Sequence, residues 1–203
     1  MARPIVAFDY DGTLVDAYEV KRESYWRAVA ETLGLDETAR PVVDASYART
    51  SGAHRLRQLA DTAQALGVEV TPAQAEMFSR RYSAYNEAAK ERIVEFPSAR
   101  AVLEALCQRC DLALISGLPQ ELLAAEAADR ALAAYFTLID GGDKDRALRR
   151  LREQGRTVLL FVGDTPHDEA VARAHGVPFH RVRGDADLAR VPAVLDEVGA
   201  GRD

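Results

Sequence analysis

The segment Ile5-Val6-Ala7-Phe8-Asp9-Tyr10-Asp11-Gly12-Thr13 decides the fold, because its short apolar run ends in two carboxylates. The apolar run predicts a buried strand, and residues two apart in an extended chain point to the same side. Asp9 and Asp11 would therefore lie together, with Gly12 permitting a sharp turn and the Thr13 hydroxyl beside them. Two like charges at a strand end are unfavourable unless a cation or a reaction needs them. An ordinary Asp-Gly turn in solvent is the alternative interpretation.

Four further apolar runs follow, and helical patterns accompany them. The five predicted strands are Ile5–Phe8, Leu112–Ile115, Thr137–Ile139, Val158–Val162 and Phe179–Val182. The accompanying helical patterns are Ser98–Arg109, Gln120–Ala133, Lys144–Glu153 and Asp168–Ala174. Strands that alternate with helices predict an α/β fold with a parallel sheet and helices on both faces. Continuous apolar strands suit a sheet that is covered on both sides.

The stretch from Asp16 to Phe96 interrupts this alternation, because it contains helical patterns only. The predicted helices of this stretch are Tyr18–Leu33, Val42–Ala48, Ala53–Leu66 and Pro72–Arg92. Thr71-Pro72-Ala73-Gln74 is typical of a helix start, with an N-cap hydroxyl, a first-position proline and a capping-box Gln. We interpret the stretch as a helical insert over the carboxyl edge of the sheet, with Phe96-Pro97 as the return hinge.

Polar residues follow the predicted strands in a fixed order along the chain. They are Asp9 with Asp11, Ser116 with Gly117, Lys144, and the group Gly163-Asp164-Thr165-Pro166-His167-Asp168. With these motifs the chain resembles the haloacid dehalogenase-like (HAD) hydrolase superfamily, specifically its phosphoglycolate phosphatase-like branch with a type 1 helical cap. The resemblance implies a Rossmann-like core domain of residues 1–15 and 97–203 and a helical cap domain of residues 16–96.

The resemblance also implies a role for each acidic and basic group. Asp9 would be the nucleophile that forms an aspartyl-phosphate, Asp11 the general acid and then the general base, and Lys144 the neutralising cation. Mg²⁺ would be held by Asp9, the Asp11 backbone carbonyl and Asp164, with Asp168 as a ligand directly or through water. The implied activity is Mg²⁺-dependent hydrolysis of a small phosphorylated metabolite.

Some of these residues have a plain structural alternative. Ser116 would donate to a phosphoryl oxygen beside the Gly117 N–H, and the alternative is a strand-end Ser-Gly turn. Lys144 would face negative charge, since a cation in the first helical turn opposes the helix dipole, and the alternative is a solvated lysine. Thr165-Pro166-His167-Asp168 also reads as a helix start, in which Asp168 is only a capping-box acid.

Substrate specificity is expected to come from the insert. Its loop Arg49–Arg55 carries Arg49 and His54, which are candidate substrate-binding residues for an anionic substrate. Gly52 would allow a ligand to approach closely. An ordinary helix connection with solvated arginines is the alternative.

Other functions fit parts of the same pattern. A sugar phosphomutase of the same superfamily uses the same four motifs, and a non-catalytic phosphate-binding module could retain the fold. The dehalogenase branch lacks the second acid, so Asp11 speaks against it. A receiver domain also gathers acids and a lysine around Mg²⁺, but it has no helical insert after its first strand.

Composition excludes several classes of protein. A net charge of -6 argues against nucleic acid as the main partner. No apolar run is long enough to span a bilayer, and no signal peptide is evident. Cys107 and Cys110 form a single C-x-x-C without a second pair, so we expect reduced thiols. A cytoplasmic protein that is a monomer or a homodimer fits these observations.

Overall fold

The computed structural model describes residues 3–200, which form two compact units. The first unit runs to Asp16 and resumes at Glu95, and the second comprises Ala17–Val94. These bounds lie close to those expected for a core and an insert. The function of the second unit as a cap stays a prediction.

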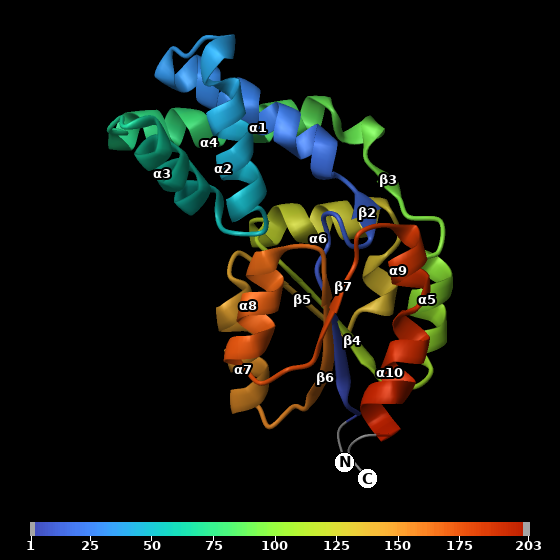
Figure 1. Ribbon diagram of the computed structural model, residues 1–203. Coiled ribbons are helices and arrows are strands. Elements are labelled where there is room, and N and C mark those ends of the chain that lie inside the picture. The colour runs from blue at the N-terminus through green and yellow to red at the C-terminus, as the bar shows by residue number, and fades with distance from the viewer. Residues whose placement is uncertain (1–2, 201–203) are drawn as a thin grey trace. The chain divides into compact units, whose positions relative to one another are not determined.

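The first unit is built on one parallel sheet with the strand order β5-β4-β1-β6-β7, which places β1 at its centre (Figure 1). The strands are β1 (Ile5–Phe8), β4 (Asp111–Ser116), β5 (Leu138–Gly141), β6 (Val158–Gly163) and β7 (Phe179–Arg181). Every residue of β1 is buried, as a continuous apolar strand between two helical layers requires. The predicted parallel α/β sheet is confirmed.

Helices cover both faces of this sheet: α7 and α8 lie on one face, and α5, α9 and α10 lie on the other (Figure 1). The bounds are α5 (Ala99–Cys107), α6 (Gln120–Asp129), α7 (Lys144–Glu153), α8 (Pro166–Ala174), α9 (Asp185–Ala189) and α10 (Val191–Ala200), with a 3-10 turn η3 (Ala133–Tyr135). On the face under α7 and α8, strand residues and helix residues share one buried cluster of Ile5, Ala7, Ala113, Ile115, Ala147, Leu148, Leu151, Phe161, Val171 and Ala172. This packing holds α7 and α8 against the sheet.

The second unit is helical and has its own aromatic core. Its elements are α1 (Tyr18–Leu33), η1 (Glu37–Ala39), α2 (Arg40–Thr50), α3 (Arg55–Leu66), α4 (Pro72–Ala88) and η2 (Lys90–Arg92). The buried core residues are Tyr25, Trp26, Ala28, Val29, Val43, Tyr47, Leu59, Phe78 and Tyr82. The capping box predicted at Thr71 and Gln74 is confirmed.

The expectation of helices alone between Asp16 and Phe96 was wrong at both ends of that stretch. Two short strands, β2 (Val15–Asp16) and β3 (Val94–Glu95), pair with each other in a separate sheet. The helix that begins at Pro72 ends at Ala88 and not at Arg92. Pairing of β3 with β2 overrides the helix propensity of the residues before it.

Two helices at the end of the chain, α9 and α10, were not predicted. Pro192 is the second residue of α10, where proline favours a helix start and does not break the helix. Within residues 3–200, no helix combines the length and the apolar character that crossing a membrane requires. Cys107 and Cys110 are free thiols, as expected.

Candidate active site

The candidate site lies at the carboxyl edge of the sheet, where several chain segments leave their strands side by side. Phe8, the last residue of β1, pairs in register with Leu114 of β4 and Val162 of β6. Asp9 follows directly, and its N–H extends the ladder by donating to the Val162 carbonyl over 2.9 Å. Parallel strands present the residues after their carboxyl ends at one edge. Asp9 is therefore held in the middle of this edge.

Lys144 is the first residue of α7, and its side chain is only 1% exposed. Its Nζ lies 2.9 Å from Asp9 Oδ1 and 2.5 Å from Asp168 Oδ1. Asp143 caps the helix, since its carboxylate accepts a bond of 3.0 Å from the Arg146 N–H. A buried ammonium at a helix N-terminus needs negative partners, and these two carboxylates supply them. The alternative of a solvated lysine is wrong.

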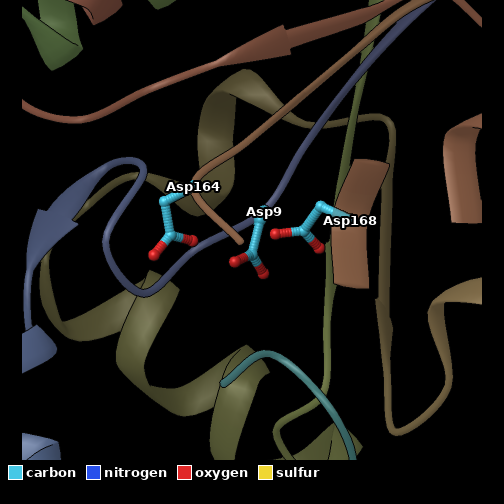
Figure 2. Close-up of side chains that lie close together, drawn as sticks. All are labelled: Asp9, Asp164 and Asp168. Atoms are coloured by element: carbon cyan, nitrogen blue, oxygen red, sulfur yellow. The ribbon is translucent and has the colours of Figure 1, made fainter. Parts of the chain in front are cut away.

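Three carboxylates converge on this place from two segments, the turn after β1 and the connection from β6 into α8. Asp9, Asp164 and Asp168 each offer an oxygen, and these oxygens lie within 4.8 Å of one another. Figure 2 shows the three carboxyl groups close together, with Asp9 between the other two. Three carboxylates and one ammonium leave two negative charges uncompensated in this group. A divalent cation carries the charge that would balance them.

Burial and, after it, the excess of negative charge raise the pKa values of two acids in this group. Burial raises the pKa of Asp9 to about 7; Lys144 opposes the shift, and Asp168 and Asp11 add to it. Burial also raises the pKa of Asp164 to about 8, with Asp9 as the next cause. Burial alone would lower the pKa of Lys144, but the attraction of Asp168 and Asp9 outweighs burial and raises it. The lysine stays charged, while Asp9 and Asp164 without a metal retain protons near neutral pH.

The residues of the site fit a hard divalent cation such as Mg²⁺. Asp164 Oδ1 is buried and has no hydrogen-bond partner among the described residues, an unfavourable state unless a ligand occupies it. Carboxylate oxygens are the donors that Mg²⁺ prefers in proteins. Within residues 3–200, the Asp11 carboxylate is not one of the three-acid group. A contribution from the Asp11 backbone carbonyl stays a prediction.

Gly12 leaves the space that the Asp164 side chain occupies. A Cβ at position 12 would overlap with Asp164 Oδ2, and the φ of Gly12 is +79°, in the left-handed region. Only glycine meets both conditions without strain. The turn after β1 therefore lets the carboxylate from the end of β6 pack directly against it.

Asp168 takes part in a helix cap as well as in the ion pair. Its Oδ2 accepts bonds from the Thr165 N–H (3.0 Å) and hydroxyl (2.6 Å), and its own N–H donates to Thr165 Oγ1 over 3.1 Å. The predicted capping box is confirmed. Since its Oδ1 binds Lys144, both oxygens have partners within the protein. Direct ligation of a metal by Asp168 would compete with these bonds, and it stays a prediction.

The polar residues expected near a phosphoryl group lie at the same edge. Ser116, the last residue of β4, is in register with Gly141 of β5 and is 2% exposed. Its Oγ accepts a bond of 3.2 Å from the Leu118 N–H, which leaves the hydroxyl hydrogen free to be donated. Gly117 follows in the same loop. Thr13 is buried, and its Oγ1 has no hydrogen-bond partner among the described residues.

Arg49 and His54 belong to the second unit, and each has a local partner there. Arg49 forms an ion pair with Asp61, which also accepts a bond of 2.7 Å from the Ser46 hydroxyl. The Nδ1 of His54 accepts a long bond of 3.4 Å from the Leu56 N–H at the start of α3. These contacts suit the alternative of an ordinary helix connection. Substrate binding by either residue stays a prediction.

Two side chains that were not predicted from the sequence hold this edge together. Gln120 accepts a bond of 2.6 Å from the Gly141 N–H and donates to the Ile139 carbonyl over 3.1 Å, so it clamps the loop after Ser116 to the end of β5. Arg181 donates to the backbone carbonyl of Asp164 over 2.8 Å. The position of Arg181 at the end of the last strand was the only signal for it. Nothing in the sequence distinguishes Gln120 from an ordinary first-turn residue.

Residues 4–176 match the family model described as haloacid dehalogenase-like hydrolase. The chain belongs to this family. Among curated HAD-like relatives, the phosphoglycolate phosphatase of Pseudomonas syringae pv. syringae is 30% identical over 191 residues, which cover 85% of this chain. The match covers 66% of that relative, so the chain spans about two thirds of its length.

Solved structures show the same fold. The predicted phosphoglycolate phosphatase from Haemophilus somnus 129pt superposes with a TM-score of 0.73 at 20% identity, covering 95% of this chain and 97% of that one. A candidate β-phosphoglucomutase from Thermotoga maritima has a TM-score of 0.62 at 22% identity, covering 96% of this chain and 99% of that one. At these identities the likeness establishes the HAD-like fold alone.

Proposed function

We propose that this HAD-like hydrolase is a Mg²⁺-dependent phosphatase that hydrolyses small phosphate monoesters through an aspartyl-phosphate on Asp9. One observation supports the proposal above all others. The buried ammonium of Lys144 lies 2.9 Å from Asp9 and 2.5 Å from Asp168 at the edge where Asp164 also arrives. A carboxylate attacks a phosphate dianion poorly, and this arrangement places positive charge beside the attacking group.

In the first step, an Asp9 carboxylate oxygen forms a bond to phosphorus as the bond from phosphorus to the alcohol oxygen breaks. Asp11 gives its proton to the departing alcohol oxygen, so the alcohol leaves neutral. In the second step, Asp11 takes a proton from water, and the water oxygen bonds to phosphorus. The bond between phosphorus and Asp9 then breaks, which releases inorganic phosphate and restores the Asp9 carboxylate and the protonated Asp11.

Asp9, the Asp11 backbone carbonyl and Asp164 would hold the Mg²⁺, and Asp168 would hold Lys144 in place. When bound, Mg²⁺ supplies charge neutralisation for the phosphoryl oxygens. Ser116 would donate its hydroxyl hydrogen to one of these oxygens, beside the Gly117 N–H. The buried Thr13 hydroxyl would serve the same group, because its Oγ1 has no other hydrogen-bond partner among the described residues.

For the substrate, the curated relatives give the first compound to test. They are named for phosphoglycolate, a small phosphorylated acid with a second negative charge. Basic residues of the second unit, Arg49 and His54 among them, would then recognise the part of the substrate that does not react. We propose residues 16–96 as the cap domain that carries this recognition, and a cytoplasmic location suits such metabolites.

A sugar phosphomutase is the second candidate, because it would use the same nucleophile and the same lysine. The structural likeness to a candidate β-phosphoglucomutase is the observation that favours this second candidate. Incubation with a phosphorylated hexose distinguishes the two activities. Release of inorganic phosphate supports the phosphatase, and isomerised sugar phosphate without phosphate release supports the mutase.

The decisive experiment replaces the nucleophile. Asp9→Asn keeps the shape of the side chain but removes the attacking carboxylate, so turnover of p-nitrophenyl phosphate and phosphoglycolate should fall at least about 10³-fold. Asp129→Asn, at the exposed end of α6, is the matched control and should retain full activity. Circular dichroism checks that both variants fold. Activity of Asp9→Asn at the level of the control would refute the mechanism.

A further inference from the structure

Arg181 is the last residue of β7, at the outer edge of the sheet and beside the end of β6. β7 pairs in parallel with β6, and the register places Arg181 directly opposite Gly163. The Val182 N–H continues this pairing by donating to the Gly163 carbonyl over 2.8 Å. Arg181 therefore lies next to Asp164, which follows Gly163.

The guanidinium of Arg181 binds two groups on either side of a turn. Its Nη1 donates to the Asp164 carbonyl over 2.8 Å, and its Nη2 lies 2.7 Å from Glu169 Oε2 in the first turns of α8. The guanidinium also lies over the ring of Phe179, at 5.5 Å from the ring centre. The side chain is 23% exposed, so these bonds are partly shielded from solvent.

The geometry points to Arg181 as a positioning residue for the divalent cation: it holds the backbone of Asp164 so that the carboxylate is presented to Asp9. The inference rests on the proposed function for its choice of cation. Asp164 is fixed at two points, since its carboxylate packs against Gly12 and its carbonyl is bound by Arg181. With the backbone fixed, the buried Asp164 Oδ1 is held in one position, where it can bind the cation.

The fork of the guanidinium suits this task, because its donors reach a carbonyl and a carboxylate together in one plane. A lysine offers a single ammonium on a flexible stem and would bind one of the two groups well. Groups that orient metal ligands typically account for about 10- to 100-fold in metal affinity. We expect an effect of that size here.

The test compares Mg²⁺ binding by calorimetry, without substrate, in the full-length protein. Arg181→Ala should weaken Mg²⁺ binding about 10-fold or more, and Arg181→Lys should restore part of the loss. Arg173→Ala is the matched control, because Arg173 also pairs with Glu169 (3.2 Å) but is 80% exposed and has no contact with Asp164. It should bind Mg²⁺ as the wild type does. Thermal unfolding checks that each variant is folded.

Affinity within twofold of the wild type in folded Arg181→Ala would overturn the inference, and so would equal losses in Arg181→Ala and Arg173→Ala. If Arg181→Ala does not fold, Arg181→Lys decides: unchanged affinity overturns the inference, and weaker binding supports it. A wild type that binds no Mg²⁺ would also overturn it. A wild type that binds Mg²⁺ through Asp164 but hydrolyses no phosphate ester would refute the proposed function and leave this inference standing.

Discussion

At the scale of single residues, the balance of charge around Lys144 matters most. The side chain is buried between Asp9 and Asp168, and a third acid, Asp164, lies in the same group. Buried ion pairs contribute little net stability compared with apolar residues, but breaking one of them is costly. The lysine thus adds little net stability, and the reaction that we propose gives the reason for its buried charge.

Replacing Lys144 by Met should show both effects. The variant keeps the length of the side chain and leaves two buried carboxylates without their cation, which should lower the free energy of unfolding by about 3–5 kcal/mol. Phosphatase activity should disappear as well. Lys90→Met is the control, since Lys90 pairs with Glu87 at the surface and such pairs contribute about 0–1 kcal/mol. Urea denaturation at pH 8 measures the free energy of unfolding of both variants. Equal values would contradict the view that Lys144 neutralises two buried carboxylates.

At the scale of elements, the turns after the strands place the polar groups of the candidate site. The turn after β1 needs Gly12, the start of α7 needs the Asp143 cap, and the start of α8 needs the capping box of Thr165 and Asp168. Gly163 is similarly constrained, because a Cβ there would lie 2.7 Å from the Asp168 Cβ. These local devices orient the side chains that the sheet only brings to the same edge.

A pair of glycine variants separates backbone strain from damage to the site. Gly12→Ala and Gly34→Ala both place an alanine at positive φ, +79° and +69°, which costs about 1–2 kcal/mol. A Cβ at position 34 meets nothing within 4 Å, whereas a Cβ at position 12 displaces Asp164. We expect both variants to lose stability, but only Gly12→Ala to lose Mg²⁺ binding. Calorimetry and thermal unfolding of both variants test this, and intact Mg²⁺ binding in Gly12→Ala would count against it.

Prediction from the sequence succeeded where local rules apply. The apolar runs identified all five strands of the main sheet. Thr71 and Thr165 identified two helix starts, because each is followed by a proline and, three residues on, by a Gln or an Asp. The positions of Asp9, Lys144 and Asp164 at strand ends followed from the same rules and the family resemblance.

What the sequence did not reveal depends on contacts between distant segments. The strand β3 exists because it pairs with β2, and its two residues are too few for a period-two pattern to mark it. The Gln120 clamp and the bond from Arg181 to the Asp164 carbonyl depend on strand order and register, which a single sequence does not specify. The same holds for the contact between Gly12 and Asp164.

At the scale of the whole molecule, ionisation of the site couples to folding. In the metal-free protein, Asp9 and Asp164 have pKa values of about 7 and about 8, against a value of 3.8 when unfolded. Between the pKa of the unfolded acids and the raised pKa values of the folded protein, the folded state binds more protons than the unfolded state does. Stability must then decrease as pH rises, because the unfolded state gives up these protons first.

We therefore expect the free energy of unfolding in the presence of a chelator to fall between about pH 4 and pH 8 and to level off above that range. Saturating Mg²⁺ should restore stability most strongly at the upper end of the range, where protons no longer compete with it. Urea denaturation at a series of pH values measures this. Asp164→Asn should reduce the pH dependence by about half, and an unchanged slope in that variant would contradict the assignment.

The central position of β1 has a consequence for how the protein is made. Ile5–Phe8 is wholly buried, yet both strands that flank it, β4 and β6, are synthesised well after it. A nascent chain thus carries an apolar segment with two unpaired edges until β4 is made and one until β6 is made, which favours aggregation and chaperone binding. Heterologous production should benefit from slow expression at low temperature, and C-terminal truncations that remove β6 should yield insoluble protein.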